Sequence, residues 1–329
     1  MKRILVALMA LTLVVGLAGC GGGEESADTQ GADQVNLGII QIVEHPALDA
    51  AREGFLDVLE ENGYADGEKL VVDYQNAQND QGNLQTIARK LVQDESDLVL
   101  AIATPSAMTM ANETSEIPIL ITAVTDPVSA KLVDSLEKPG TNVTGTTDMN
   151  PVKDQLALIQ DIVGDVEKVG IIYNSSEINS QVQVDMADKA APELGLELVK
   201  VTITASSEVM QAAQSLVGKV DAIYLPTDNM VISSLPAVLK VAEENQIPVV
   251  AGESNSVENG ALATIGINYY ELGRTTGEMA LEIIDGKAPT EMPIQSQEGS
   301  DIVVNLKAAQ AMGVEVPQEI IDKAAQVIE

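Results

Sequence analysis

Short apolar runs alternate with amphipathic stretches along the chain from residue 35 onward. The run 35–43 (VNLGIIQIV) is almost continuously apolar, whereas the apolar residues of 46–64 recur at helical spacing. Strands that are rich in Val, Ile and Leu throughout, and that are separated by helices, are typical of a parallel sheet covered on both faces. The same alternation predicts strands at 69–77, 97–103 and 117–124, a helix at 83–95 and another that begins at Pro105.

The alternation pauses at 138–149 (KPGTNVTGTTDM) and then resumes. We interpret this Gly- and Thr-rich stretch as a link between two lobes of similar α/β architecture. The second half predicts helices at 151–163, 180–195, 207–218 and 234–246, and strands at 168–173, 196–203, 221–226 and 248–252. The predicted fold class is therefore α/β, with two lobes built on parallel sheets.

The central strands end in polar clusters that lie just ahead of helices. In an open parallel sheet, ligands bind at the carboxyl ends of the strands, where helix N-termini favour a carboxylate. Ser, Thr, Asp and Asn are also ordinary helix N-caps, so any one cluster is explained equally well by capping. The stretch 174–180 exceeds the needs of a cap, and two acids, Asp228 and Glu253, lie at equivalent strand ends. Taken together, the clusters predict a ligand cleft between the lobes; they lie at 44–45, 104–106, 125–127, 174–180, 227–229 and 252–254.

The composition narrows the possible chemistry. A length of 329 residues suits about two domains. The formal charge is −32, so nucleic acid is not expected as a partner. His45 is the only histidine and Cys20 the only cysteine, which excludes disulfides, His-dependent triads and His-rich zinc sites. We expect His45 to be a loop or cap residue more readily than a ligand contact. No Trp and one Phe leave a core of Val, Ile, Leu, Ala and Met.

The first 33 residues predict export and anchoring. Lys2 and Arg3 precede an apolar run that ends in Leu17-Ala18-Gly19-Cys20. This order is that of a secretory signal, and the run is short for a membrane span. The last four residues resemble the bacterial lipobox, so we expect residues 1–20 to be a lipoprotein signal peptide with Cys20 lipidated; an ordinary signal with an accidental Cys is the alternative. Residues 21–33 then form a flexible polar tether.

Several enzyme signatures are absent from the sequence. It contains no G-x-G-x-x-G dinucleotide turn. Gly140 and Gly145 have the spacing of a phosphate loop but lack the Lys that should follow, and 252–256 lacks the second Gly of a nucleophile elbow. Asp228 and Glu253 have no adjacent nucleophile for acid–base chemistry. We therefore predict no catalytic residue, no metal site and no cofactor, and a protein that is not an enzyme.

Several ordered segments resemble the substrate-binding lipoproteins of ABC importers, in the type I periplasmic-binding family that includes tryptophan- and aromatic-amino-acid-binding members. These segments run from residue 43 to residue 284, and the resemblance extends from 35 to about 310. They are VEHPALDAAREGF, AIATPSA, ITAVTDPVSAKLV, PGTNVTGTTD, VGIIYNSSEINS, YLPTDN and ATIGINYYELGRTTGEMALEII. The resemblance implies two Rossmann-like lobes that are joined by three crossovers and close around a solute.

The resemblance also implies an approximate division of the chain. Lobe 1 would comprise 34–144 plus about 268–290, and lobe 2 would comprise 145–267 plus about 291–329. The family's ligand contacts fall in the strand-end loops, which supports as ligand-binding residues Thr104, Ser106, Asp126, Asn174, Ser175, Asn179, Asp228 and Glu253.

Physical chemistry suggests a role for each of these residues. Thr104 and Ser106 suit a ligand carboxylate, and Asp228 is our choice for an ammonium group, with Glu253 in reserve. Asn174, Ser175 and Asn179 would orient the ligand across the closed cleft. An aromatic ligand usually needs aromatic or Arg stacking, and few aromatic residues are available, so a nonaromatic amino acid or another small solute stays open.

The predicted function is that of the extracytoplasmic solute-binding subunit of an ABC importer. The subunit would be a lipid-anchored monomer whose partners are a small solute, the permease and ATPase subunits, and the membrane through its anchor. The alternative is a ligand-binding module of a chemoreceptor or sensor that does not transport.

Overall fold

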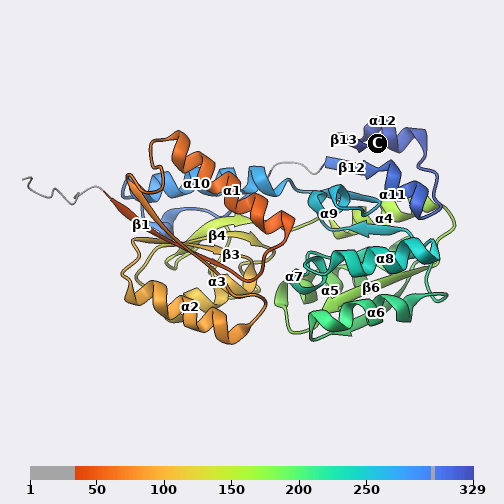
Figure 1. The fold of residues 1–329 in the computed structure, drawn as a ribbon, viewed down its shortest axis with the longest axis horizontal. Coiled ribbons are helices and arrows are strands. Elements are labelled where there is room, and N and C mark those ends of the chain that lie inside the picture. Colours follow the sequence, from red (N-terminus) through yellow and green to blue (C-terminus); the bar gives the residue numbers. More distant parts are fainter. Residues whose placement is uncertain (1–33, 298–300) are drawn as a thin grey trace, which may run out of the picture. The chain divides into compact units, whose positions relative to one another are not determined.

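A computed structural model describes residues 34–297 and 301–329. The signal peptide, Cys20 and the tether predicted for 1–33 lie outside the described residues. The described chain contains two sheets, each with helices on both faces (Figure 1). Within this part of the chain, no helix is long and apolar enough to cross a membrane.

The first sheet has the strand order β11-β5-β4-β3-β1-β2, and every pairing in it is parallel. Helices α1 and α10 cover one face, and α2 and α3 cover the other (Figure 1). The strands are β1 (Val35–Gln41), β2 (Leu70–Asn76), β3 (Leu98–Ile102), β4 (Ile119–Val124), β5 (Val143–Thr147) and β11 (Gln295–Ser296). The helices are α1 (Pro46–Glu61), α2 (Gln81–Gln93), α3 (Thr104–Glu113), α10 (Tyr269–Ile284) and the 3₁₀ turn η2 (Pro289–Glu291).

The second sheet has the order β13-β12-β10-β9-β8-β6-β7, and only β12 runs antiparallel to its neighbour β10. Helices α4 and α5 pack together, as do α6 and α8. The strands are β6 (Lys168–Asn174), β7 (Glu197–Ile203), β8 (Ala222–Leu225), β9 (Val249–Ala251), β10 (Ala263–Gly266), β12 (Asp301–Asn305) and β13 (Gln326–Ile328). The helices are α4 (Val152–Val163), α5 (Ile178–Leu194), η1 (Ser206–Glu208), α6 (Val209–Leu216), α7 (Asn229–Ile232), α8 (Leu235–Asn245), α9 (Ser254–Glu258), α11 (Leu306–Ala311) and α12 (Gln318–Lys323).

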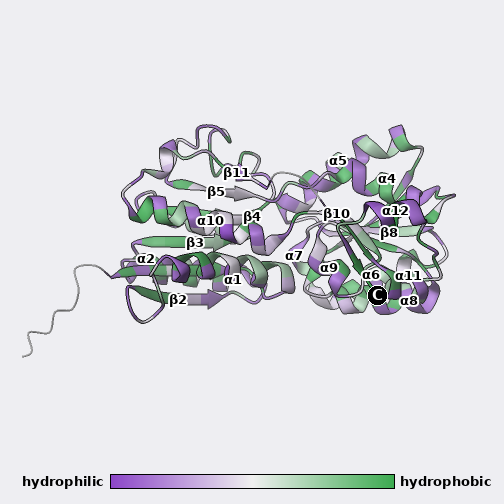
Figure 2. Ribbon diagram, turned by 90° about the horizontal axis from the view of Figure 1, so that it is seen from above, coloured by the Kyte–Doolittle hydropathy of each residue, from purple (hydrophilic) through white to green (hydrophobic). Residues whose placement is uncertain are grey.

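Each sheet has its own hydrophobic core. One core surrounds β1, β3 and β4 and includes Phe55, and the other surrounds β6, β8 and β9 and includes Tyr224. Central strands such as β3 and β8 are apolar along their length, whereas the outer helix faces carry the polar residues (Figure 2). Two separate cores confirm the predicted two-lobed α/β fold with parallel-dominated sheets.

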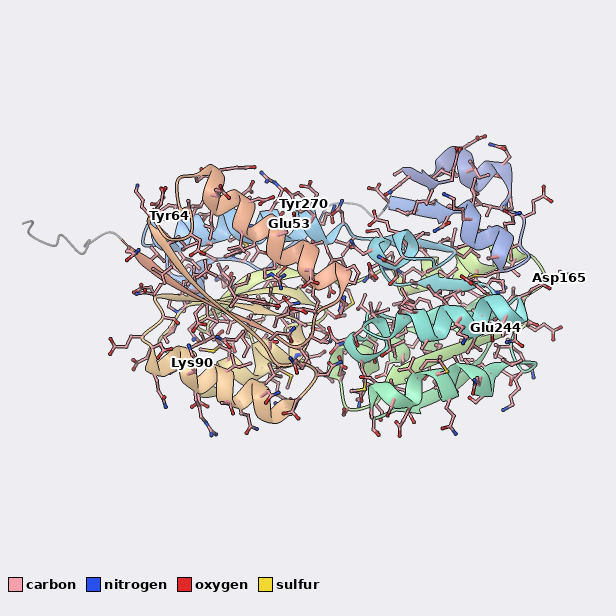
Figure 3. All side chains as sticks on the ribbon, viewed as in Figure 1. Glu53, Tyr64, Lys90, Asp165, Glu244 and Tyr270 are labelled. Carbon is pink, nitrogen blue, oxygen red and sulfur yellow. The ribbon has the colours of Figure 1, made fainter. Side chains whose placement is uncertain are left out.

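Helices α1 and α10 pack with their backbones in direct contact. A Cβ atom added to Gly54 would lie 2.1 Å from the Tyr270 carbonyl oxygen, and one added to Gly273 would lie 2.0 Å from that of Ala51. Tyr270 and Glu53 lie on these two neighbouring helices (Figure 3). The Tyr270 hydroxyl donates to Asp57 across the pair at 2.7 Å. Glycine is required here because no other residue permits this approach.

Strand β5 corrects the prediction that 138–149 is only a link. Its sequence, VTGTT, is polar, yet all five residues are buried. The Thr144 hydroxyl donates to the Met292 carbonyl at 2.7 Å, that of Thr147 donates to Thr125 at 2.7 Å, and those of Thr146 and Thr276 are 2.8 Å apart. Because each hydroxyl has a buried partner, a polar strand is stable inside the sheet.

The sheets also locate the passages of the chain between the lobes. The first passage follows β5, so the predicted division at 144/145 falls inside that strand. The second lies between β10 and α10, close to the predicted 267/268. The third lies between β11 and β12, whereas the predicted 290/291 precedes β11, which pairs with β5 in the first sheet.

Candidate functional site

A small cavity lies where the carboxyl ends of strands from both lobes meet. It has a volume of about 10 Å³, room for one water-sized group. The first lobe contributes the start of α1, Ala123 at the end of β4, and Tyr269 at the start of α10. The residues that line it are His45, Ala47, Leu48, Ala123, Asp148, Asn179, Thr227, Asn229, Ile232, Glu253 and Tyr269.

A larger cavity of about 200 Å³ adjoins the small one. The two share His45, Ala47, Ile232 and Glu253. The remaining wall of the larger cavity comes from Glu44, Pro46, Ser233, Leu235, Pro236, Asn255, Ser256 and Asn259. We call the two cavities together the cleft.

Unpartnered polar atoms gather at the cleft. Among the described residues, eight buried side-chain nitrogen or oxygen atoms have no hydrogen-bond partner. Such an atom costs roughly 1–3 kcal/mol when it stays unsatisfied, so a cluster of them requires an explanation. Four of the eight belong to residues of the cleft: His45 Nδ1, Asp148 Oδ1, Asn179 Oδ1 and Glu253 Oε2. Two more, Thr104 Oγ1 and Ser106 Oγ, line neither cavity and lie after β3, the neighbour of the strand that ends near Ala123.

Thr104 and Ser106 stand in the first turn of α3, directly after β3. Both are buried, and neither hydroxyl has a partner. The preceding residue, Ala103, has φ = 74°, a left-handed conformation that is strained for a non-glycine residue. Ala123, which lines the small cavity at the end of the neighbouring strand β4, has φ = 56°. Strained backbone of this kind clusters at binding sites.

Glu253 both caps a helix and faces the cleft. Its Oε1 accepts from the Ser256 N–H at 2.9 Å and also from the Ser256 hydroxyl. Glu253 is thereby the N-cap of α9. Its Oε2 has no partner, although only 2% of the residue is exposed. Burial raises the pKa of Glu253 to about 7. The side chain is therefore an acceptor held in place at one oxygen and free at the other.

Asp148 has the same half-satisfied arrangement. Oδ2 accepts a hydrogen bond from the hydroxyl of Tyr269, and Oδ1 has no partner. Burial raises the pKa of Asp148, and burial together with the neighbouring carboxyl raises the pKa of Tyr269. Asp148 follows β5 where the chain passes to the second lobe, and Tyr269 begins α10 where the chain has returned.

A buried network around Glu177 orients the amides of the second lobe. Asn229 Nδ2 donates to Glu177 Oε2 at 2.6 Å, and Asn179 Nδ2 donates to the same oxygen at 3.2 Å. Asn179 Nδ2 also donates to the Thr227 carbonyl at 3.1 Å. Burial raises the pKa of Glu177, and the nearby Asp228 raises it further. The network fixes the amide nitrogens and leaves Asn179 Oδ1 without a partner.

The other predicted residues are engaged within their own loops. The carboxylate of Asp126 accepts from the N–H groups of Val128 and Ser129 at 3.1 and 3.0 Å. Asn174 Oδ1 accepts from the Ser176 N–H at 3.0 Å, and Ser175 is exposed.

Asp228 is completely buried within the second lobe. Its Oδ2 accepts from the Asn174 N–H at 2.6 Å and from the Ser180 hydroxyl at 2.7 Å. Its Oδ1 accepts from the Val231 N–H at 2.9 Å as the N-cap of α7. Both oxygens thus have partners inside the lobe, and Asp228 does not line either cavity of the cleft.

Asp148 and Tyr269 are not among the candidate residues predicted from the sequence. Asp148 lies in the segment interpreted as a link, and Tyr269 lies in a stretch without a polar cluster. A signal for Asp148 is present, because an acid ends the run VTGTTD as acids end β8 and β9. His45, expected as a loop or cap residue, lines both cavities. Burial lowers the pKa of His45 to about 4, so the ring is neutral.

The described residues contain no group of three or more His, Cys, Asp or Glu side chains arranged to hold a metal ion. The cleft instead offers hydroxyl, amide and carboxylate groups around an apolar wall. Such a lining suits an organic solute that carries polar groups at one end.

Comparisons with known proteins agree with this geometry. The sequence model of the ABC transporter substrate-binding protein family matches residues 36–328. The chain is 46% identical over 321 residues to a tyrosine-binding protein of Clostridioides difficile, which covers 95% of this chain and 93% of that protein. A solved domain from Streptococcus pneumonia in complex with L-Trp has a TM-score of 0.86 at 35% identity, and covers 90% of this chain and 100% of its own. These comparisons confirm the predicted type I periplasmic-binding fold and favour a transporter subunit over a sensor module or an enzyme.

A further comparison bears on the arrangement of the lobes. The ligand-free, open structure of a substrate-binding protein with adhesive properties from Clostridium difficile is 50% identical and covers 89% of this chain and 99% of its own, but its TM-score is only 0.67. By sequence identity alone, the open structure would be expected to match this chain better than the L-Trp complex does. The described chain also has a hydrogen bond between the lobes, from Asn79 Nδ2 to Ser233 Oγ at 3.3 Å. The arrangement therefore resembles the ligand-bound relative more than the open one.

Proposed function

Because the chain belongs to the ABC transporter substrate-binding protein family, we propose that it captures an aromatic α-amino acid, tyrosine or tryptophan, outside the cytoplasmic membrane. As a monomer it would deliver this solute to the permease and ATPase subunits of an importer. The ligands named for two relatives, tyrosine at 46% identity and L-Trp at 35% identity, support this choice of solute.

The observation that carries the proposal is the set of unpartnered polar atoms at the cleft. They come from both lobes, they are buried, and a bound zwitterion would satisfy them. A solute that contacts both lobes stabilises the closed arrangement, because it binds the open one less well.

The hydroxyls of Thr104 and Ser106 are proposed to bind the ligand carboxylate. They stand at the N-terminus of a ten-residue helix, where free N–H groups and a partial positive charge favour an anion. Asp126, Asn174 and Ser175 are proposed to shape the loops rather than to contact the solute.

The larger cavity is proposed to receive the aromatic ring. Its wall includes the apolar side chains of Ala47, Ile232 and Leu235 and two prolines. Tyr269, one of the few aromatic residues of the chain, lines the adjoining small cavity. Two aromatic rings prefer an offset or edge-to-face arrangement. One aromatic side chain of the protein is therefore enough to form such a pair with the ring of the solute.

Calorimetry with L-tyrosine, L-tryptophan, L-phenylalanine and L-leucine tests the proposal, after unfolding and refolding have removed any copurified solute. We expect an aromatic amino acid to bind at least about tenfold more tightly than leucine, a difference of about 1.4 kcal/mol. The double variant Thr104→Val, Ser106→Ala should weaken binding, whereas the loop variant Ser175→Ala should not. Mass spectrometry that finds a copurified solute other than an aromatic amino acid, combined with no heat from tyrosine or tryptophan, would overturn the proposal.

We also propose that Cys20 carries a lipid that anchors the mature protein to the outer face of the membrane. The support is the basic, apolar and small-residue order of residues 2–20. Cys20→Ala should move the protein from the membrane fraction to the soluble fraction. Retention of that variant in the membrane, with an unmodified N-terminal peptide in the wild type, would contradict the anchor.

A further inference from the structure

Three acceptor oxygens belong to residues that line the small cavity. They are Asp148 Oδ1, Asn179 Oδ1 and Glu253 Oε2; each is buried and none has a hydrogen-bond partner. A primary ammonium group carries three N–H donors and no acceptor. We infer that this cavity is a seat for an unsubstituted ammonium group, and that the protein selects α-amino acids with a free primary amine. The inference rests on the proposed function and adds to it the group by which the solute is recognised.

The orientation of each acceptor is fixed by the hydrogen bonds of its other polar atom. Asn179 Nδ2 donates to Glu177 and to the Thr227 carbonyl, so exchanging its nitrogen and oxygen would set Oδ1 against two acceptors. Asp148 is held through Tyr269, and Glu253 through Ser256. Each oxygen is therefore oriented by its own surroundings before the ligand arrives, and the entropy lost on binding is reduced.

The two acids at the cavity also favour a cation, because a neighbouring ammonium group stabilises their ionised forms against the burial that raises their pKa values. Asp148 and Glu253 are buried acids, and neither belongs to an ion pair within the part of the chain that the structure describes. The other titratable side chains on its wall are His45, which is neutral, and Tyr269, which already donates to Asp148. A water molecule has only two donors and no charge, so it would satisfy the three oxygens less well than an ammonium group.

The size of the cavity limits what the amine can carry. Its volume of about 10 Å³ accommodates one water-sized group. A methyl or acetyl substituent on the nitrogen would have to displace the walls, among them the fully buried side chain of Leu48 and the backbone at Ala123. The rest of the solute would occupy the adjoining larger cavity.

Calorimetry on the mature chain with a matched ligand series tests the seat. The series is L-tyrosine, N-methyl-L-tyrosine and 3-(4-hydroxyphenyl)propionate, which lacks only the amine. Removal of the amine should weaken binding by roughly a hundredfold or more, because the buried acids lose their charged partner. N-methylation keeps the charge but replaces one N–H donor by a methyl group that the cavity cannot accommodate, so it should weaken binding by roughly a hundredfold as well. If either analogue binds within about tenfold of tyrosine, the inference is overturned.

Variants of the protein test the same point from the other side. Glu253→Gln and Asp148→Asn should each weaken tyrosine binding and leave the affinity for the amine-free analogue almost unchanged. Asp126→Asn, in a loop outside the cleft, is the matched control and should alter neither. Thermal melts confirm that each variant is folded, and if Asp148→Asn does not fold, Asn179→Ala replaces it. Equal losses for tyrosine and the amine-free analogue would contradict the seat.

Failure of the ammonium seat can be distinguished from failure of the proposed aromatic specificity. If tyrosine and tryptophan both fail to bind, the aromatic specificity falls, and the copurified solute decides the seat. A solute with a primary amine supports the inference, and a solute without one overturns it.

Discussion

The phenol of Tyr269 donates a hydrogen bond to one carboxylate oxygen of Asp148 and leaves the other oxygen without a partner. The two residues lie at two separate passages between the lobes, one after β5 and the other at the start of α10. This hydrogen bond therefore joins two of the connecting segments next to the cleft. It also holds a carboxylate at the cavity that we assign to the ligand amine.

Tyr269→Phe should weaken tyrosine binding by roughly tenfold, since the hydrogen bond to a charged group contributes about 1.5–3 kcal/mol. Without its donor, Asp148 is ionised less readily and moves more freely. Calorimetry at neutral pH measures the loss. Tyr270→Phe is the matched control, because the Tyr270 hydroxyl donates to Asp57 outside the cleft. Equal losses for the two variants would show that the effect is not specific to Asp148.

The ligand-free protein should lose stability as the pH rises from about 4.5 to about 7. Burial raises the pKa of Glu253 from 4.5 to about 7, so in this window the folded state binds a proton that the unfolded state has released. The contribution is fully present below pH 4.5 and is lost as the pH passes 7, a change of roughly 3 kcal/mol for one such group. Burial shifts the pKa values of Asp148, Glu177 and Asp228 in the same direction.

Urea unfolding at pH 5 and at pH 8 measures this dependence. Glu253→Gln should reduce it, which makes the variant more stable than the wild type at pH 8 while its ligand affinity falls. Glu244→Gln is the control, because Glu244 is an exposed residue of the second lobe (Figure 3). An identical pH dependence in wild type and Glu253→Gln would rule out Glu253 as its source.

Asp228→Asn should destabilise the protein by roughly 1–3 kcal/mol, the cost of a buried donor without a partner. Its carboxylate accepts from the Asn174 N–H, the Ser180 hydroxyl and the Val231 N–H, and an amide cannot accept from all three. Chemical unfolding measures the stability, and calorimetry measures ligand affinity. We expect the affinity of the folded variant to change by less than about tenfold. A larger loss at unchanged stability would return the ammonium contact to Asp228, as its strand-end position in the sequence suggests.

Gly273→Ala should destabilise the first lobe by roughly 1–3 kcal/mol or more through overpacking. The added Cβ would lie 2.0 Å from the Ala51 carbonyl oxygen on the facing helix. Glu278→Ala, an exposed position on the same helix, is the control and should have little effect. Thermal unfolding compares the two. A stable Gly273→Ala variant would show that α1 and α10 can separate without cost.

The fold was predictable from the sequence because its central strands are apolar throughout. Buried strands such as β3 and β8 show as continuous apolar runs, and the helices between them have regular spacing. Strand β5 has no such apolar run, and the hydrogen-bond partners of its threonines include residues as distant in sequence as Thr276 and Met292. A local pattern contains no information about such partners.

The site was only partly predictable for the same reason. Strand-end position selects Asp228 and Glu253 equally, and both act as N-caps. The structure distinguishes them by the second oxygen, which has two donors in Asp228 and none in Glu253. Tyr269 could not be found because it belongs to a helix of the first lobe and reaches the cleft through the packing of that helix.

The direct contact between α1 and α10 has a consequence for the order of events in solute capture. These helices carry His45, Leu48 and Tyr269 at their starts, and their touching backbones prevent one from sliding past the other. The part of the site that the first lobe contributes is therefore rigid while the lobes are apart, and it is already formed when a solute arrives. The association rate then depends on this part, whereas the dwell time depends on how well Asn179 and Glu253 engage after closure. Stopped-flow mixing should accordingly show second-lobe variants that release solute faster and capture it at the wild-type rate.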